Sequence, residues 1–507
     1  MVVLTGNTLS IDQVKRVARG QEEVSLATTA AQKVSQSRKM VERLVAENRV
    51  VYGITTGFGK FSDTRISPAE ATRLQENLLK SHAAGTGAPL PEEVVRAMML
   101  LRVNALAKGH SGIKRSTLEL LIQMLNRGVV PWIPEQGSVG ASGDLVPLAH
   151  MALSLLGEGQ AYYQDQLISS QLALERAGLK PVQLASKEGL ALINGTQMMA
   201  ALGVLAIIDS ENLAGHADLA LALTMEALQG ILSPFNPLIH AVRPHPGQAV
   251  VARNISGLCQ GSKLVLEQRV DRVQDAYSLR CAPQVHGASR DSIVHVKGII
   301  AREINSATDN PLLFPAEGLV ISGGNFHGQP LALGLDYLAM ALSELGNIAE
   351  RRMARLVDAS LNNGLEMFLT KYGGLNSGYM IPQYTAASLV SENKVLAGPA
   401  SIDSIPTSAN QEDHVSMGSI SARKVRKIID NLENILAIEI IAAVQGIDLR
   451  TDQPIKTLGT GSKIIYQRVR EVVEPLGEDR IIYPELKVIK EMIHRGELVQ
   501  AVAGLID

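Results

Sequence analysis

Residues 137–150 read Gly-Ser-Val-Gly-Ala-Ser-Gly-Asp-Leu-Val-Pro-Leu-Ala-His, and the rest of the chain is organised around this stretch. Three glycines and two serines fall within its first seven residues, and an apolar helical pattern begins directly after them. Asp144 stands where it can cap that helix, which we expect to continue to about Leu156, with Pro147 tolerated in the first turn. This glycine-rich entry to a helix is the strongest candidate for chemistry in the chain.

The tripeptide Ala141-Ser142-Gly143 can be the precursor of an electrophile that the chain makes from itself. In a tight bend, the Gly143 amide nitrogen can approach the Ala141 carbonyl carbon, because neither residue carries a bulky side chain. Ring closure with loss of water gives an imidazolone, and loss of the Ser142 hydroxyl as a second water leaves a methylidene carbon. The tripeptide alone is expected by chance in about one chain in four of this length. A plain glycine-rich turn is therefore the alternative interpretation.

Length and composition indicate a folded and mostly helical protein. Of the 507 residues, 46% are hydrophobic and 19% are charged, so a disordered chain is not expected. Aromatic residues make up only 3%, so aliphatic side chains must fill the core, which suits closely packed helices. The length exceeds that of one ordinary core and predicts several domains or one large helical body.

Net charge and cysteine content limit the classes of partner and the cellular compartment that we expect. The formal net charge of −2 favours neither nucleic acid nor an anionic membrane as a partner. Cys259 and Cys281 are the only cysteines, which fits the reducing cytoplasm and excludes a cysteine-built zinc or iron–sulfur site. No secretion signal is evident, and the best apolar run, 435–444, is shorter than the ~18 residues of a membrane span. We therefore expect a cytoplasmic location.

The hydrophobic periodicity predicts a mainly α fold, a long-helix bundle with a smaller mixed N-terminal region. Ser10 is placed to start a first helix. Strand signals are limited to a pair near the N-terminus and a hairpin near 160–168. The predicted helix over 327–358 would be about 48 Å long at ~1.5 Å per residue. Several parallel helices of that length make an elongated bundle. The main predicted helices cover residues 67–83, 91–108, 115–127, 197–232, 291–307, 327–358 and 416–446, with smaller ones over 455–507.

Three segments follow from this pattern. An N-terminal region, 1–193, carries the Ala-Ser-Gly loop. A central long-helix bundle covers 194–450, and C-terminal helices cover 451–507.

Other catalytic motifs fit the sequence poorly. A serine-hydrolase elbow requires G-x-S-x-G, but Asp144 occupies the last position. Residues 459–463 place Gly-Ser before Lys, the wrong order for a phosphate loop. His240 and His245 are separated by prolines, and no H-x-x-x-H pair occurs, so we expect no metal.

The stretch around Ser142 resembles the signature of the aromatic amino-acid ammonia-lyases, which build a methylidene-imidazolone from Ala-Ser-Gly. Five further blocks are similar to those of the family and occur in family order across residues 45–450. They are VYGITTGFGKFSD (51–63), KEGLALINGTQ (187–197), VQDAYSLRCAPQVHG (273–287), ATDNPL with ISGGNFHGQP (307–330) and SANQEDHVSMG (408–418). The resemblance implies a lyase of the aspartase/fumarase-like helical fold, whose only cofactor is the group formed from Ala141, Ser142 and Gly143.

The resemblance also implies roles for individual residues. Tyr52 matches the loop tyrosine that removes the substrate's β-proton, and a tyrosine hydroxyl would need activation for that task. Arg280 matches the residue that binds the substrate carboxylate, for which a guanidinium offers a bidentate fit. Tyr277 matches a catalytic residue that orders the active site. Asn194 matches a residue in contact with the imidazolone and the substrate. Gln274 and Phe326 match residues of the active-site wall. Structural packing is the alternative for Gln274 and Phe326.

Two places in the sequence indicate which substrate the chain accepts. Within the family, they make the chain most similar to members that act on L-histidine and release trans-urocanate. Ser81-His82 matches those members, although some tyrosine aminomutases share the pair. Glu412 is placed against the substrate ring, where a carboxylate makes a charge-assisted hydrogen bond to an imidazole N–H. A phenyl or phenol ring would offer this carboxylate much less, and burying it unpaired would be costly.

The alternatives are a tyrosine or phenylalanine ammonia-lyase or a 2,3-aminomutase of the same family and, outside it, a non-catalytic helical scaffold. Residues 365–369 depart from the stretch usual in histidine-specific members, and residues 243–248 are similar to those of aminomutases. The family resemblance further implies a homotetramer with active sites shared between subunits.

Overall fold

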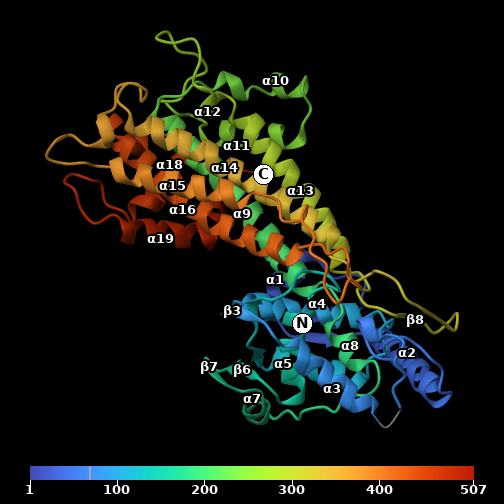
Figure 1. Ribbon diagram of the computed structural model, residues 1–507. Helices are drawn as coiled ribbons and strands as arrows, with labels where there is room; N and C mark the ends of the chain where they lie inside the picture. Colours follow the sequence, from blue (N-terminus) through green and yellow to red (C-terminus); the bar gives the residue numbers. More distant parts are fainter. Residues whose placement is uncertain (68–69, 507) are drawn as a thin grey trace. The chain divides into compact units, whose positions relative to one another are not determined.

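The computed structural model describes residues 1–67 and 70–506, which divide into two compact units (Figure 1). The first unit comprises Met1–Leu205, Lys297–Asp336 and Pro399–Arg423. The second comprises Ala206–Val296, Tyr337–Gly398 and the chain from Lys424 onward. Each unit is therefore built from segments that lie far apart in the sequence.

The first unit combines short helices with very short strands. A capping box starts its first helix, because the Ser10 side chain accepts from the Gln13 backbone and the Gln13 side chain accepts from the Ser10 backbone. Its helices are α1 (Ile11–Ala18), α2 (Thr28–Ala46), η1 (Gly59–Phe61), α3 (Ala71–His82), α4 (Glu92–Ala107), α5 (Arg115–Asn126), α6 (Leu145–Leu153), η2 (Ser154–Leu156), α7 (Ser170–Arg176) and α8 (Glu188–Ile193).

Four small sheets complete the described part of this unit. Strands β1 (Val2–Leu4) and β2 (Val24–Leu26) pair in parallel. The predicted hairpin is present as antiparallel β6 (Gln160–Tyr163) and β7 (Gln166–Ser169). The remaining strands are β3 (Thr86–Pro89) paired with β5 (Pro134–Gln136), β4 (Val130–Pro131) paired with β6, and β8 (Leu312–Phe314) paired with β9 (Leu319–Ile321).

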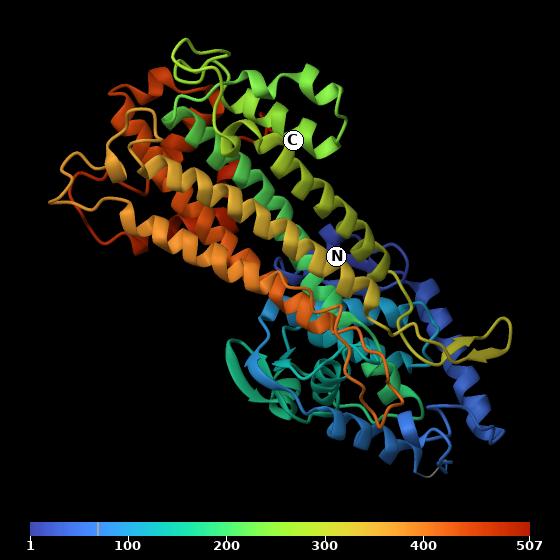
Figure 2. The same ribbon diagram turned by 45° about the horizontal axis from the view of Figure 1, so that its top comes forward.

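The second unit has helices and no paired strands among the described residues, and its long helices lie side by side (Figures 1 and 2). The long helices are α9 (Gln197–Ala227), α13 (Ala282–Glu303), α14 (Gln329–Val357), α15 (Met380–Leu396) and α16 (Gly418–Arg450). The shorter ones are η3 (Ser233–Phe235), α10 (Pro237–Ala241), α11 (Pro246–Leu258), α12 (Tyr277–Arg280), η4 (Met367–Leu369), α17 (Pro454–Thr457), α18 (Thr460–Arg470), α19 (Tyr483–His494) and α20 (Glu497–Ala501). Apart from the one at residues 398–399, the boundaries between the units fall inside helices, namely α9, α13, α14 and α16.

A buried ionic group ties the bundle together. Arg352 of α14 pairs with Glu439 of α16, and both side chains are fully buried. Glu439 also accepts from Thr224 of α9 at 2.8 Å. A buried ion pair adds little stability relative to apolar packing, but it fixes which helix faces meet.

The mainly α long-helix architecture with a smaller mixed N-terminal region is confirmed, and most predicted helices match observed ones within a few residues. The start predicted at residue 291 is wrong, because α13 already begins at Ala282. Pro283 does not prevent this, since proline is compatible with a first helical turn. The prediction that a helix begins at residue 67 falls partly on residues 68–69, which lie outside the described residues; α3 is seen from Ala71. The three-segment division stays a prediction.

Helix α9 is apolar enough by length and composition alone to cross a membrane. However, 89% of its most apolar window is buried inside the protein. A helix that is apolar on all sides is typical of a protein core. The apolar run predicted at 435–444 lies in α16 and is buried as well.

Candidate active site

The loop before α6 adopts a conformation that its glycines permit. Gly143 has a φ of +74°, and a Cβ on it would lie 2.2 Å from the Gly195 carbonyl oxygen. The next residue, Asp144, donates its backbone N–H to the same oxygen at 2.6 Å. Glycine is therefore the residue that fits position 143, with its backbone pressed against the connection between α8 and α9.

Asp144 does not cap α6 with its side chain, contrary to the sequence prediction. Its carboxylate instead accepts the Met199 backbone N–H of α9 at 2.9 Å and the Ser138 hydroxyl at 3.3 Å. Complete burial raises the pKa of Asp144 to about 7. The residue thus ties the loop to the start of α9, which sequence periodicity could not reveal because the partner lies 55 residues away.

Ser142 faces a carboxylate from a distant loop. Its hydroxyl donates to Glu412 Oε1 at 2.8 Å, and the Thr407 hydroxyl donates to Glu412 Oε2 at 2.7 Å. Both residues of the Ser142–Glu412 pair are half-buried. Next to Ser142, the buried Ala141 packs against Val415 and Met417. The structure therefore brings the predicted precursor and the predicted ring-binding carboxylate into direct contact.

His82 lies within the electrostatic reach of Glu412. It is the last residue of α3, and its Nδ1 lies 3.0 Å from the Ser81 hydroxyl. Burial lowers the pKa of His82, while a backbone hydrogen bond with Leu78 and the charge of Glu412 act in the opposite direction. The net shift favours the neutral form of the imidazole.

Tyr52 lies in the glycine-rich segment after α2. Its hydroxyl oxygen accepts the Gly59 backbone N–H at 3.2 Å. A side chain at Gly59 would come within 3.0 Å of the Ser408 hydroxyl, which belongs to the same loop as Glu412. The Tyr52 segment therefore runs beside the loop that carries the carboxylate.

Asn194 is the C-cap residue that follows α8, directly before the glycine that contacts the Gly143 loop. Its side-chain nitrogen donates to the Asn310 carbonyl at 3.3 Å. The side chain is almost fully buried, with 3% of the residue exposed, and its Oδ1 has no hydrogen-bond partner. An unpaired buried oxygen marks a position that a ligand can satisfy.

Phe326 is half-buried just before α14. Its neighbour His327 stacks on His414 with ring centroids 5.7 Å apart, next to the loop of Glu412. The sequence reasoning missed this histidine pair and Thr407, because no spacing rule links residues of two separate loops.

The remaining predicted residues belong to the second unit. Tyr277 and Arg280 are the ends of α12, and the Arg280 guanidinium lies 4.5 Å above the Tyr277 ring. Arg280 also donates to the Asp275 carbonyl at 2.9 Å. Gln274 and Tyr277 are exposed, Tyr277 by 70%. These residues, Gln274, Tyr277 and Arg280, belong to the second unit, whereas Ser142 belongs to the first.

The site has the parts for acid–base and covalent chemistry on a small polar substrate. A serine in a glycine-rich loop, a carboxylate, an imidazole, a phenol and a buried amide come from five segments of the first unit. Across residues 1–67 and 70–506, no group of three or more His, Cys, Asp or Glu side chains is arranged to hold a metal ion.

Comparisons with known proteins agree along the whole chain. Residues 9–471 match the family described as "Aromatic amino acid lyase". The chain is 54% identical over 506 residues to the histidine ammonia-lyase of Alkaliphilus oremlandii, covering 100% of this chain and 99% of that protein. The crystal structure of histidine ammonia-lyase from Trypanosoma cruzi is similar with a TM-score of 0.92 at 45% identity, covering 100% and 96% of the two chains. A tyrosine aminomutase from Streptomyces globisporus has a TM-score of 0.95 at 39% identity, covering 100% and 99%.

Proposed function

The chain belongs to the aromatic amino acid lyase family, and on this premise we propose that it is a histidine ammonia-lyase. It eliminates ammonia from L-histidine and releases trans-urocanate, which opens the degradation of histidine. The observation that carries the choice of substrate is the contact of Glu412 with Ser142 at 2.8 Å. A carboxylate at that place accepts a hydrogen bond from an imidazole N–H, which neither a phenyl ring nor an unsubstituted aliphatic chain can donate.

The residues at 141–143 fit the methylidene-imidazolone of the family. The left-handed φ of Gly143, the small buried side chain of Ala141 and the half-exposed hydroxyl of Ser142 are the features that ring closure and loss of two waters require. When formed, the group supplies an electrophilic carbon that no ordinary side chain offers. The start of α6 and the start of α9 both lie beside it, and helix N-termini stabilise negative charge nearby.

Tyr52 takes the β-proton of the substrate. Its hydroxyl oxygen already accepts the Gly59 N–H, and this hydrogen bond holds the phenol in place. The lowered pKa of His82 favours its neutral form, which leaves the Glu412 carboxylate free to bind the substrate ring. Asn194 offers its unpaired Oδ1 as a hydrogen-bond acceptor in the same unit.

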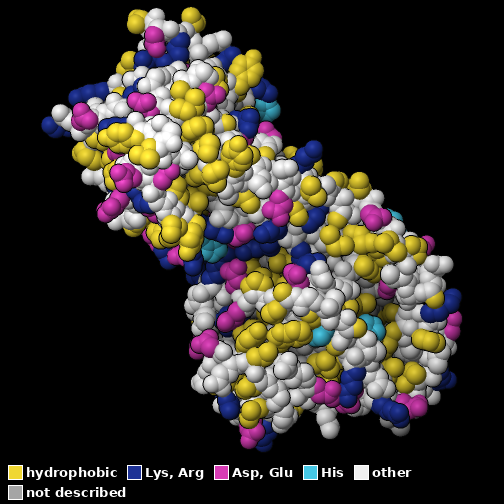
Figure 3. All heavy atoms as spheres, turned by 60° about the vertical axis from the view of Figure 1, so that its left-hand side comes forward, with side chains coloured by type: hydrophobic (Ala, Val, Ile, Leu, Met, Phe, Trp, Pro, Cys, Tyr) yellow, Lys and Arg dark blue, Asp and Glu magenta, His cyan; other side chains and the backbone are white. Residues whose placement is uncertain are grey.

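The carboxylate end of the substrate is bound by Arg280, with Gln274 and Tyr277 beside it. We propose that this group completes the site of another subunit in a homotetramer. The segment around it carries exposed apolar side chains, including Val270, Val273 and Tyr277, and such a surface is typical of an interface. Figure 3 shows hydrophobic side chains exposed among charged ones on one face of the molecule. We expect the tetramer in the cytoplasm, in keeping with the two free cysteines.

A tyrosine-directed lyase or 2,3-aminomutase is the second candidate, favoured by the structural likeness to a tyrosine aminomutase. The assay that separates the two follows ultraviolet absorbance of the product with L-histidine, L-tyrosine or L-phenylalanine as substrate. We expect urocanate from L-histidine and no comparable product from the other two. The absence of histidine turnover, with turnover of an aryl amino acid, would reverse the assignment.

The intact mass tests the prosthetic group independently of any substrate. Loss of two waters lowers the mass by ~36 Da relative to the sequence. A mass equal to that of the sequence, in an active enzyme, would rule out the imidazolone.

A further inference from the structure

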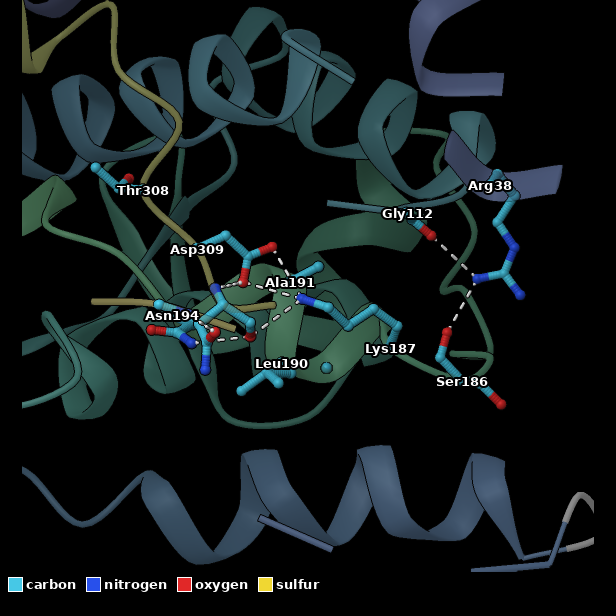
Figure 4. Close-up of polar contacts among 12 residues, drawn as sticks. Arg38, Gly112, Ser186, Lys187, Leu190, Ala191, Asn194, Thr308 and Asp309 are labelled. Carbon is cyan, nitrogen blue, oxygen red and sulfur yellow. Dashed lines mark hydrogen bonds and ion pairs between the residues drawn. The ribbon is translucent and has the colours of Figure 1, made fainter. Parts of the chain in front are cut away.

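A fully buried ion pair lies close to Asn194 in the first unit (Figure 4). Lys187 Nζ lies 3.0 Å from Asp309 Oδ1 and 2.9 Å from Oδ2, and the two side chains are 0% and 1% exposed. Desolvation lowers the pKa of Lys187, and the charge of Asp309 opposes this shift. The pair plays no part in the proposed reaction, and the sequence reasoning did not identify it.

The ion pair holds a backbone carbonyl. Asp309 Oδ1 accepts the Asn310 N–H at 2.7 Å, and Lys187 Nζ lies 3.4 Å from the Asn310 carbonyl oxygen. The carbonyl of Thr308 accepts from the buried Arg102 at 3.1 Å. Residues 308–310 are therefore held from two sides by buried cations, and Figure 4 shows Lys187 and Asp309 pointing toward each other.

The Asn310 carbonyl in turn determines the orientation of the Asn194 side-chain amide. A carbonyl oxygen can only accept a hydrogen bond, so the Asn194 amide must present its NH₂ group to it, as it does at 3.3 Å. The Asn194 oxygen is then left buried and without a partner. With the opposite rotamer, two oxygens would face each other and the free group would be a donor.

Buried ion pairs seldom add net stability, because desolvation of both charges offsets their attraction. Their best-supported use is to select one arrangement of the groups around them. Here the arrangement selected is that of residues 308–310, and the only polar side chain of the proposed site that touches it within the described chain is Asn194.

We propose that Lys187 and Asp309 are a positioning pair, which holds the Asn310 carbonyl so that Asn194 presents its oxygen to an N–H group of the substrate. This inference rests on the proposed function, because it takes Asn194 as a substrate-binding residue. It adds the requirement that an ion pair outside the substrate site controls that residue. Neither Lys187 nor Asp309 touches the substrate.

The test is a coupled series of variants in the full-length protein. Removing one partner of a buried pair leaves an uncompensated charge, so both are changed together in Lys187→Met/Asp309→Asn, which keeps an oxygen for the Asn310 N–H. The series contains this double variant, Asn194→Ala, and the triple variant. Arg38→Met is the matched control, because buried Arg38 donates to the carbonyls of Gly112 and Ser186 and not to residues 308–310 (Figure 4).

We expect the double variant to lower kcat/KM for L-histidine roughly 10- to 100-fold, as a misplaced polar contact does. The triple variant should be no worse than Asn194→Ala alone, within about 2-fold, because the pair acts only through Asn194. The control should stay within about 3-fold of the unaltered chain. The ~36 Da mass deficit should persist in all of them.

Three results would each overturn the inference. The first is a triple variant whose loss equals the product of the separate losses, since the pair would then act independently of Asn194. The second is an equal loss in Arg38→Met, and the third is loss of the mass deficit in the double variant. If the double variant does not fold, Lys187→Gln/Asp309→Asn, whose two amides can still hydrogen-bond, takes its place in the series with the same expected results.

The proposed function is tested separately by the unaltered chain. If it does not turn over L-histidine but does turn over another amino acid, the substrate assignment fails. The same series is then measured with the accepted amino acid, so the coupling between the pair and Asn194 is still decided.

Discussion

The loop at 137–144 and the segment at 266–280 contrast sharply, although both carry residues assigned to one site. The loop is held by contacts with three other segments. Its backbone contacts Gly195, its Asp144 holds the start of α9, and its Ser142 already contacts Glu412. The segment leaves Val270, Val273 and Tyr277 exposed, and its helix has only four residues. The loop makes these contacts within the chain, whereas the segment leaves apolar side chains exposed.

This difference indicates a division of labour. The group that we propose is built covalently lies where hydrogen bonds from several segments fix the backbone. The group that we propose binds the substrate carboxylate lies on a surface that we expect another subunit to cover. Four measurements can break or sharpen this comparison, in order of decreasing effect.

The largest effect is expected for Ser142→Ala. Without the hydroxyl, no second water can be lost and no methylidene carbon forms, so activity should fall by roughly 10³-fold or more. The mass deficit of ~36 Da should shrink or vanish in the same protein. Residual activity close to that of the unaltered chain would mean that the braced loop is only a structural turn.

Arg280→Ala should cost roughly 10²- to 10³-fold in kcat/KM, because a bidentate carboxylate contact is lost. The decisive measurement is the activity of a mixture of two variants. Inactive Arg280→Ala chains and inactive Ser142→Ala chains, unfolded and refolded together, should regain activity if one subunit's Arg280 serves another subunit's Ser142. If mixing restores nothing, although each variant alone refolds to the native oligomer, Arg280 serves its own chain.

Glu412→Gln should lower kcat/KM for L-histidine by roughly 10- to 100-fold, since a charge-assisted hydrogen bond becomes a neutral one. Turnover of L-phenylalanine, whose ring has no N–H or O–H to donate, should, if measurable, change much less. The ratio of the two values is the measurement, and Asp413→Asn, on the exposed neighbouring residue, is the matched control. Equal losses for both substrates would show that Glu412 braces Ser142 without selecting the ring.

The smallest expected effect is on stability. Burial raises the pKa of Asp144 to about 7, above that of an unfolded aspartate near ~3.8, so the folded state binds the extra proton between these values. Its contribution to stability is complete below about pH 4 and is lost as the pH rises toward 7. Asp144→Asn cannot ionise. The difference in unfolding free energy between variant and unaltered chain should therefore shift in favour of the variant from pH 4 to pH 8. A constant difference across that range would contradict a protonated Asp144.

Local features of the chain could be predicted well. The start of the first helix at Ser10, the hairpin of β6 and β7, and the long helices follow from caps, turns and periodicity, which depend on neighbours within a few residues. The start of α13 could not be placed as well, because Pro283 is compatible both with a break and with a first helical turn. The partner of Asp144 could not be predicted because two helices begin near it, and the sequence shows only the one that follows.

By itself, the sequence determined which chemistry the chain carries. It placed a small, glycine-flanked serine before a helix, and it supplied a carboxylate, a phenol and an amide in separate blocks. Only the tertiary structure decided which of these groups meet. Ser142 and Glu412 are 270 residues apart, and Lys187 and Asp309 are 122 apart. No local preference specifies such pairs, because they depend on how helices and loops pack once apolar faces are buried. The same packing gave position 143 a backbone that only glycine fits, turning a common tripeptide into a candidate electrophile.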